Sequence, residues 1–157
     1  MRRFCLVTML LCVCAIGALG QTPTPTPDPP TTPGSVWRIT YYEIKPGKGA
    51  EFTKFRREHS KPILDELKKQ GLILDYKWFT QPTSEGPNNW DLAFAILFRN
   101  YAEALDFNAE RGQKFNEITL KHYGTAEART KADDSQRDLR DVVSSHLVRE
   151  QIVNPIK

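Results

Sequence analysis

Residues 90–98 (WDLAFAILF) constrain the fold most strongly, because this segment is apolar on both faces of a β-strand. Side chains alternate between the two faces of a strand. One face would carry the larger side chains of Trp90, Leu92, Phe94, Ile96 and Phe98. The other face would carry Ala93, Ala95 and Leu97. A strand of this kind is central in its sheet and is covered on both sides.

Three further segments have the composition of strands. Residues 36–44 (VWRITYYEI) are rich in β-branched and aromatic residues and end at a Lys-Pro-Gly turn signal. Residues 72–79 and 142–153 are the other two expected strands, and each has apolar residues on both faces. The sequence therefore predicts a sheet of four strands, joined in part by a loop at 81–89.

A helix is expected over residues 48–70, and Gly71 is expected to end it. Its apolar stripe recurs at steps of three and four residues and consists of Phe52, Phe55, His59, Ile63 and Leu67. Pro62 lies inside this helix and cannot donate a backbone hydrogen bond, which predicts a kink near Glu58 or Ser60.

A second helix is expected from a capping pair, Asn100 and Glu103, to Tyr123. We expect this helix to be broken or kinked near Gly112 and to end at Gly124. Residues 125–140 are polar and half charged, which predicts a solvated helix or loop.

The predicted order β-α-β-β-α-β is the ferredoxin-like arrangement of the α+β class, a four-stranded antiparallel sheet with both helices on one face. The first and third strands would be central. Nothing else in the chain covers the other sheet face, which would leave an unusually large apolar patch on a monomer. We therefore expect a homodimer, with a second copy stacked on this face.

The first 20 residues have the pattern of a secretory signal peptide. Two arginines precede an apolar run, and Ala18-Leu19-Gly20 offers small residues for cleavage. The alternative is an uncleaved anchor, although residues 4–19 are shorter than the roughly 20 apolar residues that span a bilayer. We expect an exported protein, periplasmic or extracellular, with no stable membrane insertion after cleavage.

Residues 21–34 are rich in threonine and proline (TPTPTPDPPTTP at 22–33), which predicts an extended, disordered linker ahead of a domain at 35–157. All cysteines, Cys5, Cys12 and Cys14, lie in the predicted signal peptide, so we expect no disulfide. The net charge of +3 includes Arg2 and Arg3, and a near-neutral domain argues against nucleic acid as a partner.

Several stretches resemble the dimeric α/β-barrel superfamily, most closely its small exported bacterial members of unknown function. These stretches are YYEIKPGKGAEF at 41–52, KPILDELKKQGLILDY at 61–76, and WDLAFAILF at 90–98. The resemblance implies a ferredoxin-like fold that dimerises into a barrel. The superfamily includes cofactor-free quinol-type monooxygenases and haem-degrading enzymes, but the Asn, Trp and His constellation of the latter has no counterpart here.

His59 is the candidate catalytic residue, because a histidine on an apolar helix face can act as an acid or base near neutral pH. The alternative is a packing residue hydrogen-bonded to Tyr41 or Tyr76. His122 is expected to pack, and His146 would pair with Asp75 if their strand faces agree. The three histidines lack metal-ligand spacing, so neither a metal nor any other cofactor is expected.

The strands carry a large aromatic set, from which we select Tyr41, Tyr76, Trp78 and Trp90 as candidate ligand-binding residues. A pocket for a planar apolar ligand is one interpretation. Core and dimer interface is the other. Three functions stay open: an exported domain that binds a small apolar or aromatic ligand, a cofactor-independent monooxygenase acting on an aromatic or quinol-type substrate, and a structural or interaction module.

Overall fold

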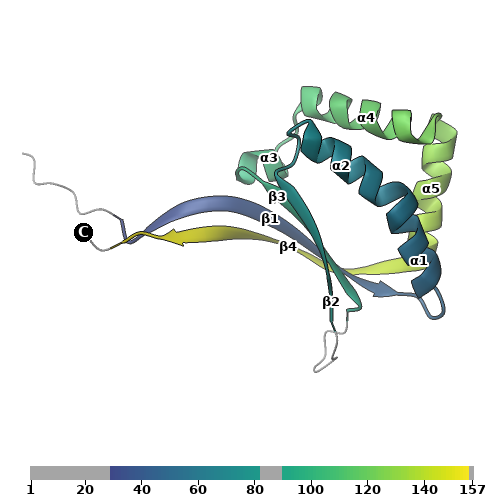
Figure 1. Cartoon of the computed structure of the whole chain (residues 1–157), viewed down its shortest axis with the longest axis horizontal. Helices are drawn as coiled ribbons and strands as arrows, with labels where there is room; N and C mark the ends of the chain where they lie inside the picture. Colours follow the sequence, from purple (N-terminus) through teal and green to yellow (C-terminus); the bar gives the residue numbers. More distant parts are fainter. Residues whose placement is uncertain (1–28, 82–89, 156–157) are drawn as a thin grey trace, which may run out of the picture.

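The computed structural model describes residues 29–81 and 90–155, which form one four-stranded antiparallel sheet with helices on one face (Figure 1). The strands are β1 (Thr31–Ile44), β2 (Asp75–Thr80), β3 (Leu92–Phe98) and β4 (Arg140–Val153). Their order is β2-β3-β1-β4, and every neighbouring pair is antiparallel. This is the predicted ferredoxin-like α+β fold, with the two most apolar strands, β1 and β3, in the centre.

The predicted signal peptide, most of the linker and most of the loop at 81–89 lie outside the described residues. β1 begins at Thr31, which pairs with Val153, so residues 31–34 belong to the sheet although we assigned them to the linker. The Asn154 amide donates to the carbonyl of Pro30 at 3.0 Å and extends this pairing. The domain therefore starts before the expected boundary at residue 35.

The first helical segment changes its winding in the middle. It consists of α1 (Gly49–Phe55), the π-helical turn η1 (Arg56–Ser60) and α2 (Lys61–Lys69). Pro62 has no N–H for the carbonyl of Glu58, and the Lys61 amide instead donates to Arg56, five residues back. The predicted irregularity is confirmed, in the form of a widened turn.

Gly71 ends this helix in a left-handed conformation with a φ of +69°. The Leu72 amide donates back to the carbonyl of Leu67 at 2.9 Å. As a result Leu72 and Ile73 are buried beside the helix, and β2 starts only at Asp75 instead of residue 72.

The second helical segment is divided into α3 (Tyr101–Leu105), α4 (Ala109–Tyr123) and α5 (Ala126–Leu139). Asn100 accepts a hydrogen bond from the Glu103 amide at 2.9 Å, as its capping pattern predicts. The expected break at Gly112 is wrong, because the chain breaks before α4 and Asn108 starts the new helix by accepting from the Arg111 amide at 2.9 Å. Residues 126–139 form a helix, α5, which Thr125 caps.

The strand register assigns each side chain to one sheet face. Arg38 pairs with Ile96, and Thr40 pairs with Phe94. Tyr76 and Trp78 occupy the same two levels on β2. This face turns toward the helices and supplies the sheet side of the core, in which Val36, Tyr42, Leu92 and Phe98 are buried against Phe52, Leu64, Leu67 and Ile118.

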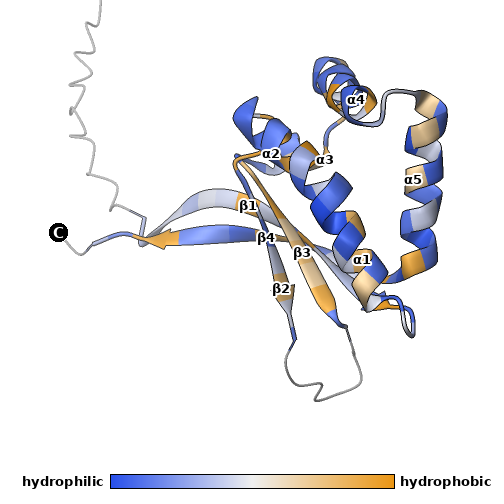
Figure 2. Ribbon diagram, turned by 45° about the vertical axis from the view of Figure 1, so that its right-hand side comes forward, coloured by the Kyte–Doolittle hydropathy of each residue, from blue (hydrophilic) through white to orange (hydrophobic). Residues whose placement is uncertain are grey.

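The opposite face, which we call the open face, carries Trp37, Ile39 and Tyr41 of β1, Phe79 of β2, and Val148 of β4. Within the described part of the chain no helix covers it, and Figure 2 shows the helices gathered on the other side. Ala93 and Ala95 also lie on this face but are only 2% and 1% exposed, because larger neighbours overhang them. Val148 remains 44% exposed.

Among the described residues, no helix has both the length and the apolar character needed to cross a membrane.

Candidate functional site

A cavity lies between the helices and the inward face of the sheet. It has two adjoining parts, of about 540 Å³ and about 250 Å³, and both are lined by Leu67, Ile96 and Phe115. We call the two parts together the inner cavity. Its apolar lining comes from α1, α2, β3 and α4 and consists of Phe55, Ile63, Leu64, Leu67, Phe94, Ile96, Phe98 and Phe115.

The arrangement of the helices leaves this space open. Leu64 and Leu67 of α2 are buried in the core against the sheet. In contrast, α4 contacts α2 and α5 and lies farther from the sheet than α2 does (Figure 1). Helix α2 packs directly on the sheet, whereas α4 stands farther from it. The inner cavity is the space that this difference leaves between α4 and the sheet.

Helix α5 contributes polar groups to the smaller part of the inner cavity. Arg129, Asp133 and Gln136 line it together with Tyr123 at the end of α4. Burial, and secondly the Asp133 carboxylate, raise the pKa of the Tyr123 hydroxyl. No sequence pattern pointed to this role, because residues 125–140 are mostly polar and half of them are charged.

Two arginines line the larger part. Arg38 of β1 donates to the carbonyl of Ala104, and Arg111 of α4 donates to those of Glu103 and Leu72 at 2.8 and 2.7 Å. Both guanidinium groups lie against the Phe98 ring, 5.4 and 5.8 Å from its centroid. Sequence reasoning missed them, although an arginine at an inward position of a central strand was a usable signal.

His59 lies outside the lining of the inner cavity. Its Nδ1 is 3.1 Å from Nε2 of His122, and its ring centroid lies 5.0 Å from that of Phe55 and 5.3 Å from that of Tyr123. Neither Tyr41 nor Tyr76 is its partner, because Tyr41 lies on the open face and Tyr76 donates to Asp65. Burial, and secondly the His59 ring, lower the pKa of His122.

The four aromatic candidates do not come together. Tyr76 and Trp78 lie on the helix-facing side of β2, where Trp78 stacks on Phe94 at 5.6 Å. Tyr41 and Trp90 meet on the open face with a centroid distance of 5.1 Å. None of the four lines the inner cavity. They form two separate aromatic clusters.

The conditional pairing of His146 with Asp75 does not occur. The two residues belong to β4 and β2, which are the opposite edges of the sheet. Asp75 instead forms an ion pair with Lys68 at 2.7 Å, and His146 lies beside Tyr41 with a ring-centroid distance of 5.8 Å. Across residues 29–81 and 90–155, no group of three or more His, Cys, Asp or Glu side chains is placed to hold a metal ion.

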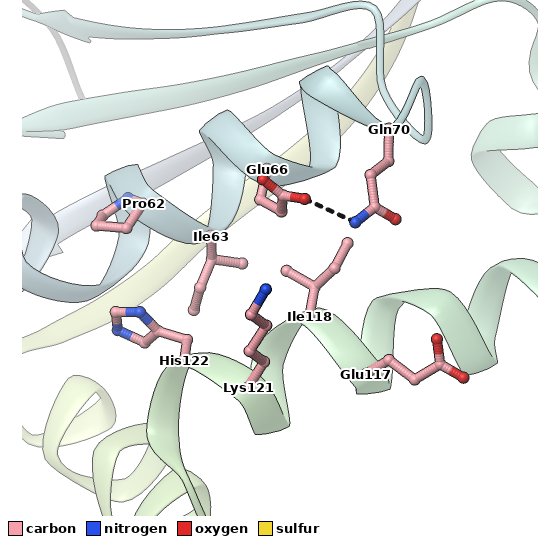
Figure 3. Close-up of a pocket in the computed structure, with 8 residues that line it drawn as sticks. All are labelled: Pro62, Ile63, Glu66, Gln70, Glu117, Ile118, Lys121 and His122. Atoms are coloured by element: carbon pink, nitrogen blue, oxygen red, sulfur yellow. Dashed lines mark hydrogen bonds between the residues drawn. The ribbon is translucent and has the colours of Figure 1, made fainter.

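A second hollow of about 390 Å³, the outer groove, lies between α2 and α4. Figure 3 shows the residues that line it. Its rim carries Glu66, Gln70, Glu117 and Lys121, and Gln70 donates to Glu66 at 2.8 Å. Ile63 lines both this groove and the inner cavity. The lining of the outer groove is about equally polar and apolar, whereas the lining of the inner cavity is predominantly apolar with a few polar groups, which is typical of small-molecule sites.

The strand order, the antiparallel pairing and the one-sided helices define a ferredoxin-like α+β domain. Two similar solved structures are a dimeric protein of unknown function and ferredoxin-like fold from Bacteroides fragilis and a dimeric ferredoxin-like protein from an uncultured marine organism. The first is 16% identical, covers 76% of this chain and 97% of its own, and has a TM-score of 0.39. The second is 11% identical, covers 79% and 92%, and has a TM-score of 0.41.

No family model matches the chain, and no curated protein matches it.

Proposed function

We propose that this chain is an exported, homodimeric domain that binds a small apolar or aromatic molecule in its inner cavity. The observation that carries the proposal is the apolar lining shared by two adjoining spaces of about 540 and 250 Å³. Ligand sites of drug-sized molecules have about 300–1,000 Å³ and combine an apolar lining with a few polar groups. The phenylalanines supply flat surfaces for a planar ligand.

The dimer is supported by the open face. Phe79 and Val148 on this face are both more than two-fifths exposed, and Trp37 and Tyr41 lie between them. Ile152 follows Val148 on the same side of β4 and is 55% exposed. A cluster of exposed apolar side chains on an uncovered sheet face is typical of an interface. A second copy stacked sheet to sheet would cover it and leave each inner cavity within its own subunit.

Export is supported by the sequence of the first 20 residues alone. Cleavage after Gly20 would leave Gln21 as the first residue of the mature protein. Intact-mass measurement of protein recovered from an exporting host tests this step. A mass that still includes Cys5, Cys12 and Cys14 would show that the segment is retained.

The monooxygenase hypothesis has less support than ligand binding. It depended on His59 as the ionisable group of a site between the first helix and the sheet, and this residue points to His122 instead. The only ionisable groups in the smaller part of the inner cavity are Tyr123, Arg129 and Asp133, as far as the described residues extend. An enzyme acting here would have to use those groups.

A substitution at Gly112 tests ligand binding directly. Gly112 lines the larger part of the inner cavity, and a Cβ built on it meets no atom within 4 Å. Gly112→Leu should therefore fill the cavity without a clash and abolish binding of naphthalenemethanol, measured by isothermal titration calorimetry. Gly112→Ala is the matched control and should bind nearly as well as the parent. Equal binding by all three proteins would contradict the proposed site.

A further inference from the structure

We propose that the ligand of the inner cavity is an amphipathic acid, whose apolar body occupies the cavity and whose carboxylate binds to Arg38. This inference rests on the proposed function and specifies its ligand class. Arg38 stands on the inward face of β1, at the level of Ile96, where the surrounding positions of the sheet are apolar. A charged side chain at such a position is costly unless it is paired and hydrogen-bonded.

The guanidinium group of Arg38 has donors to spare. It donates through Nη2 to the carbonyl of Ala104. Within residues 29–81 and 90–155, no carboxylate lies within ion-pair distance of Arg38, whereas Arg99 pairs with Glu103 at 3.0 Å. Arginine has five N–H donors, so most of its hydrogen-bonding capacity is left for a ligand.

Arg111 fixes the surroundings of Arg38. Arg38 and Arg111 donate to the consecutive carbonyls of Ala104 and Glu103, and both guanidinium groups lie near the Phe98 ring. Arg111 is anchored further by the carbonyl of Leu72 and by the Glu103 carboxylate at 4.0 Å. It therefore adds positive charge beside Arg38 but offers fewer free donors.

The charges around this end of the cavity favour an anion. Arg38 and Arg111 line this end together with two carboxylates, those of Glu103 and Asp106. Glu103 is already engaged by Arg99 and Arg111, so its charge is compensated without Arg38. The planar guanidinium group matches the two oxygens of a carboxylate. Leu67, Ile96 and Phe115 would then hold the apolar body, because they continue from this end into the smaller part of the inner cavity.

The experiment compares naphthalenecarboxylate with naphthalenemethanol, which have the same ring system and differ in charge. Titration calorimetry at neutral pH should show the carboxylate binding at least about tenfold more tightly to the parent protein. Arg38→Gln should remove this preference and leave the affinity for the alcohol unchanged. Arg38→Lys, which keeps the charge, should retain most of the preference and shows whether position 38 tolerates change.

A control variant is Arg57→Gln, which removes an exposed positive charge from η1 and should leave both affinities unchanged. The inference is overturned if both probes bind the parent equally, or if Arg38→Gln keeps the preference; in either case the alcohol still binds and the proposed function stands. If neither probe binds the parent and Gly112→Leu makes no difference, the proposed function itself fails and this inference fails with it.

Discussion

The Nδ1 atom of His59 lies 3.1 Å from the Nε2 atom of His122, so a hydrogen bond joins the π-helical turn η1 to the last turn of α4. The two residues are 63 positions apart in the chain. The rings of Phe55 and Tyr123 pack against the same histidine. This contact therefore ties the first helical segment to the end of α4 outside the lining of the inner cavity.

We predict that His59→Phe lowers stability and leaves ligand binding largely intact. The substitution keeps a ring against Phe55 and Tyr123 but removes the bond to His122, which costs about 1 kcal/mol. Urea denaturation measures the stability and titration with naphthalenemethanol measures the affinity, which should stay within about twofold of the parent because His59 does not line the inner cavity. Unchanged stability together with loss of binding or turnover would restore the catalytic interpretation of His59.

Stability should fall as the pH drops from 7.5 to 5.5. Burial and the nearby His59 ring lower the pKa of His122 below its usual value of 6.5, so the folded protein binds this proton less readily than the unfolded chain. Neutral His122 therefore makes its full contribution to the free energy of unfolding above a pH of about 6.5. This contribution is lost as the pH falls through 6.5 toward the lower pKa of the folded protein.

The pH test uses thermal melts of the parent and of His122→Gln, whose amide group can take the place of Nε2 and hydrogen-bond to His59 but does not titrate. The variant should show a smaller loss of melting temperature over this pH range. Carboxylates such as Asp65 and Asp75 have lowered pKa values because lysine side chains bond to them, so their contribution is lost only at more acidic pH. An identical pH dependence in both proteins would contradict the assignment to His122.

The two faces of the sheet predict opposite consequences for the same kind of substitution. Val148→Lys places a charge on the open face and should yield a folded monomer, seen by sedimentation velocity and circular dichroism. Phe94→Lys places a charge among Trp78 and the helix-facing core and should unfold the domain. A parent protein that is monomeric at micromolar concentration would contradict the proposed dimer.

Gly112 predicts a gain in stability. It lies inside α4, where glycine costs about 1 kcal/mol relative to alanine. Its φ is not positive and an added Cβ has free space, so Gly112→Ala should raise the free energy of unfolding by about that amount. A loss of stability would show that the backbone at this position does not accept a side chain.

The sequence predicts the architecture of this domain well. Strands that are apolar on both faces must lie in the centre of the sheet, and helices with one apolar stripe must pack on it, so few arrangements of the elements are possible. Residues 36–44 and 90–98 identify the central strands, and Pro62 locates the irregular turn. The start of α4 was missed because Asn108 acts as a cap without a clear sequence signal, while Gly112 looked like a breaker and is tolerated inside a helix.

The candidate site was predicted less well, for two physical reasons. An apolar stripe does not show how far a helix stands from the sheet. The position of His59 on such a stripe therefore predicted a place in a site between helix and sheet, but His59 does not line the inner cavity. Periodicity does not show which faces of different strands lie together, so Tyr41 was grouped with Tyr76 and Trp78. Trp90 was expected on the face of Phe94, but β3 starts only at Leu92, and Trp90 packs against Tyr41 on the open face. Arg38 was overlooked although strand alternation already places it on the face of Val36 and Tyr42, and the register against Ile96 shows that this face turns toward the helices.

Methyl-detected NMR tests the central claim, that the inner cavity is the ligand site, most directly. The protein would be labelled at isoleucine, leucine and valine methyl groups and titrated with naphthalenemethanol. We predict shifts of Ile63, Leu67 and Ile96, which line the inner cavity, with Val148 and Ile152 unaffected. Shifts confined to Val148 and Ile152 would place the ligand on the open face and contradict the account.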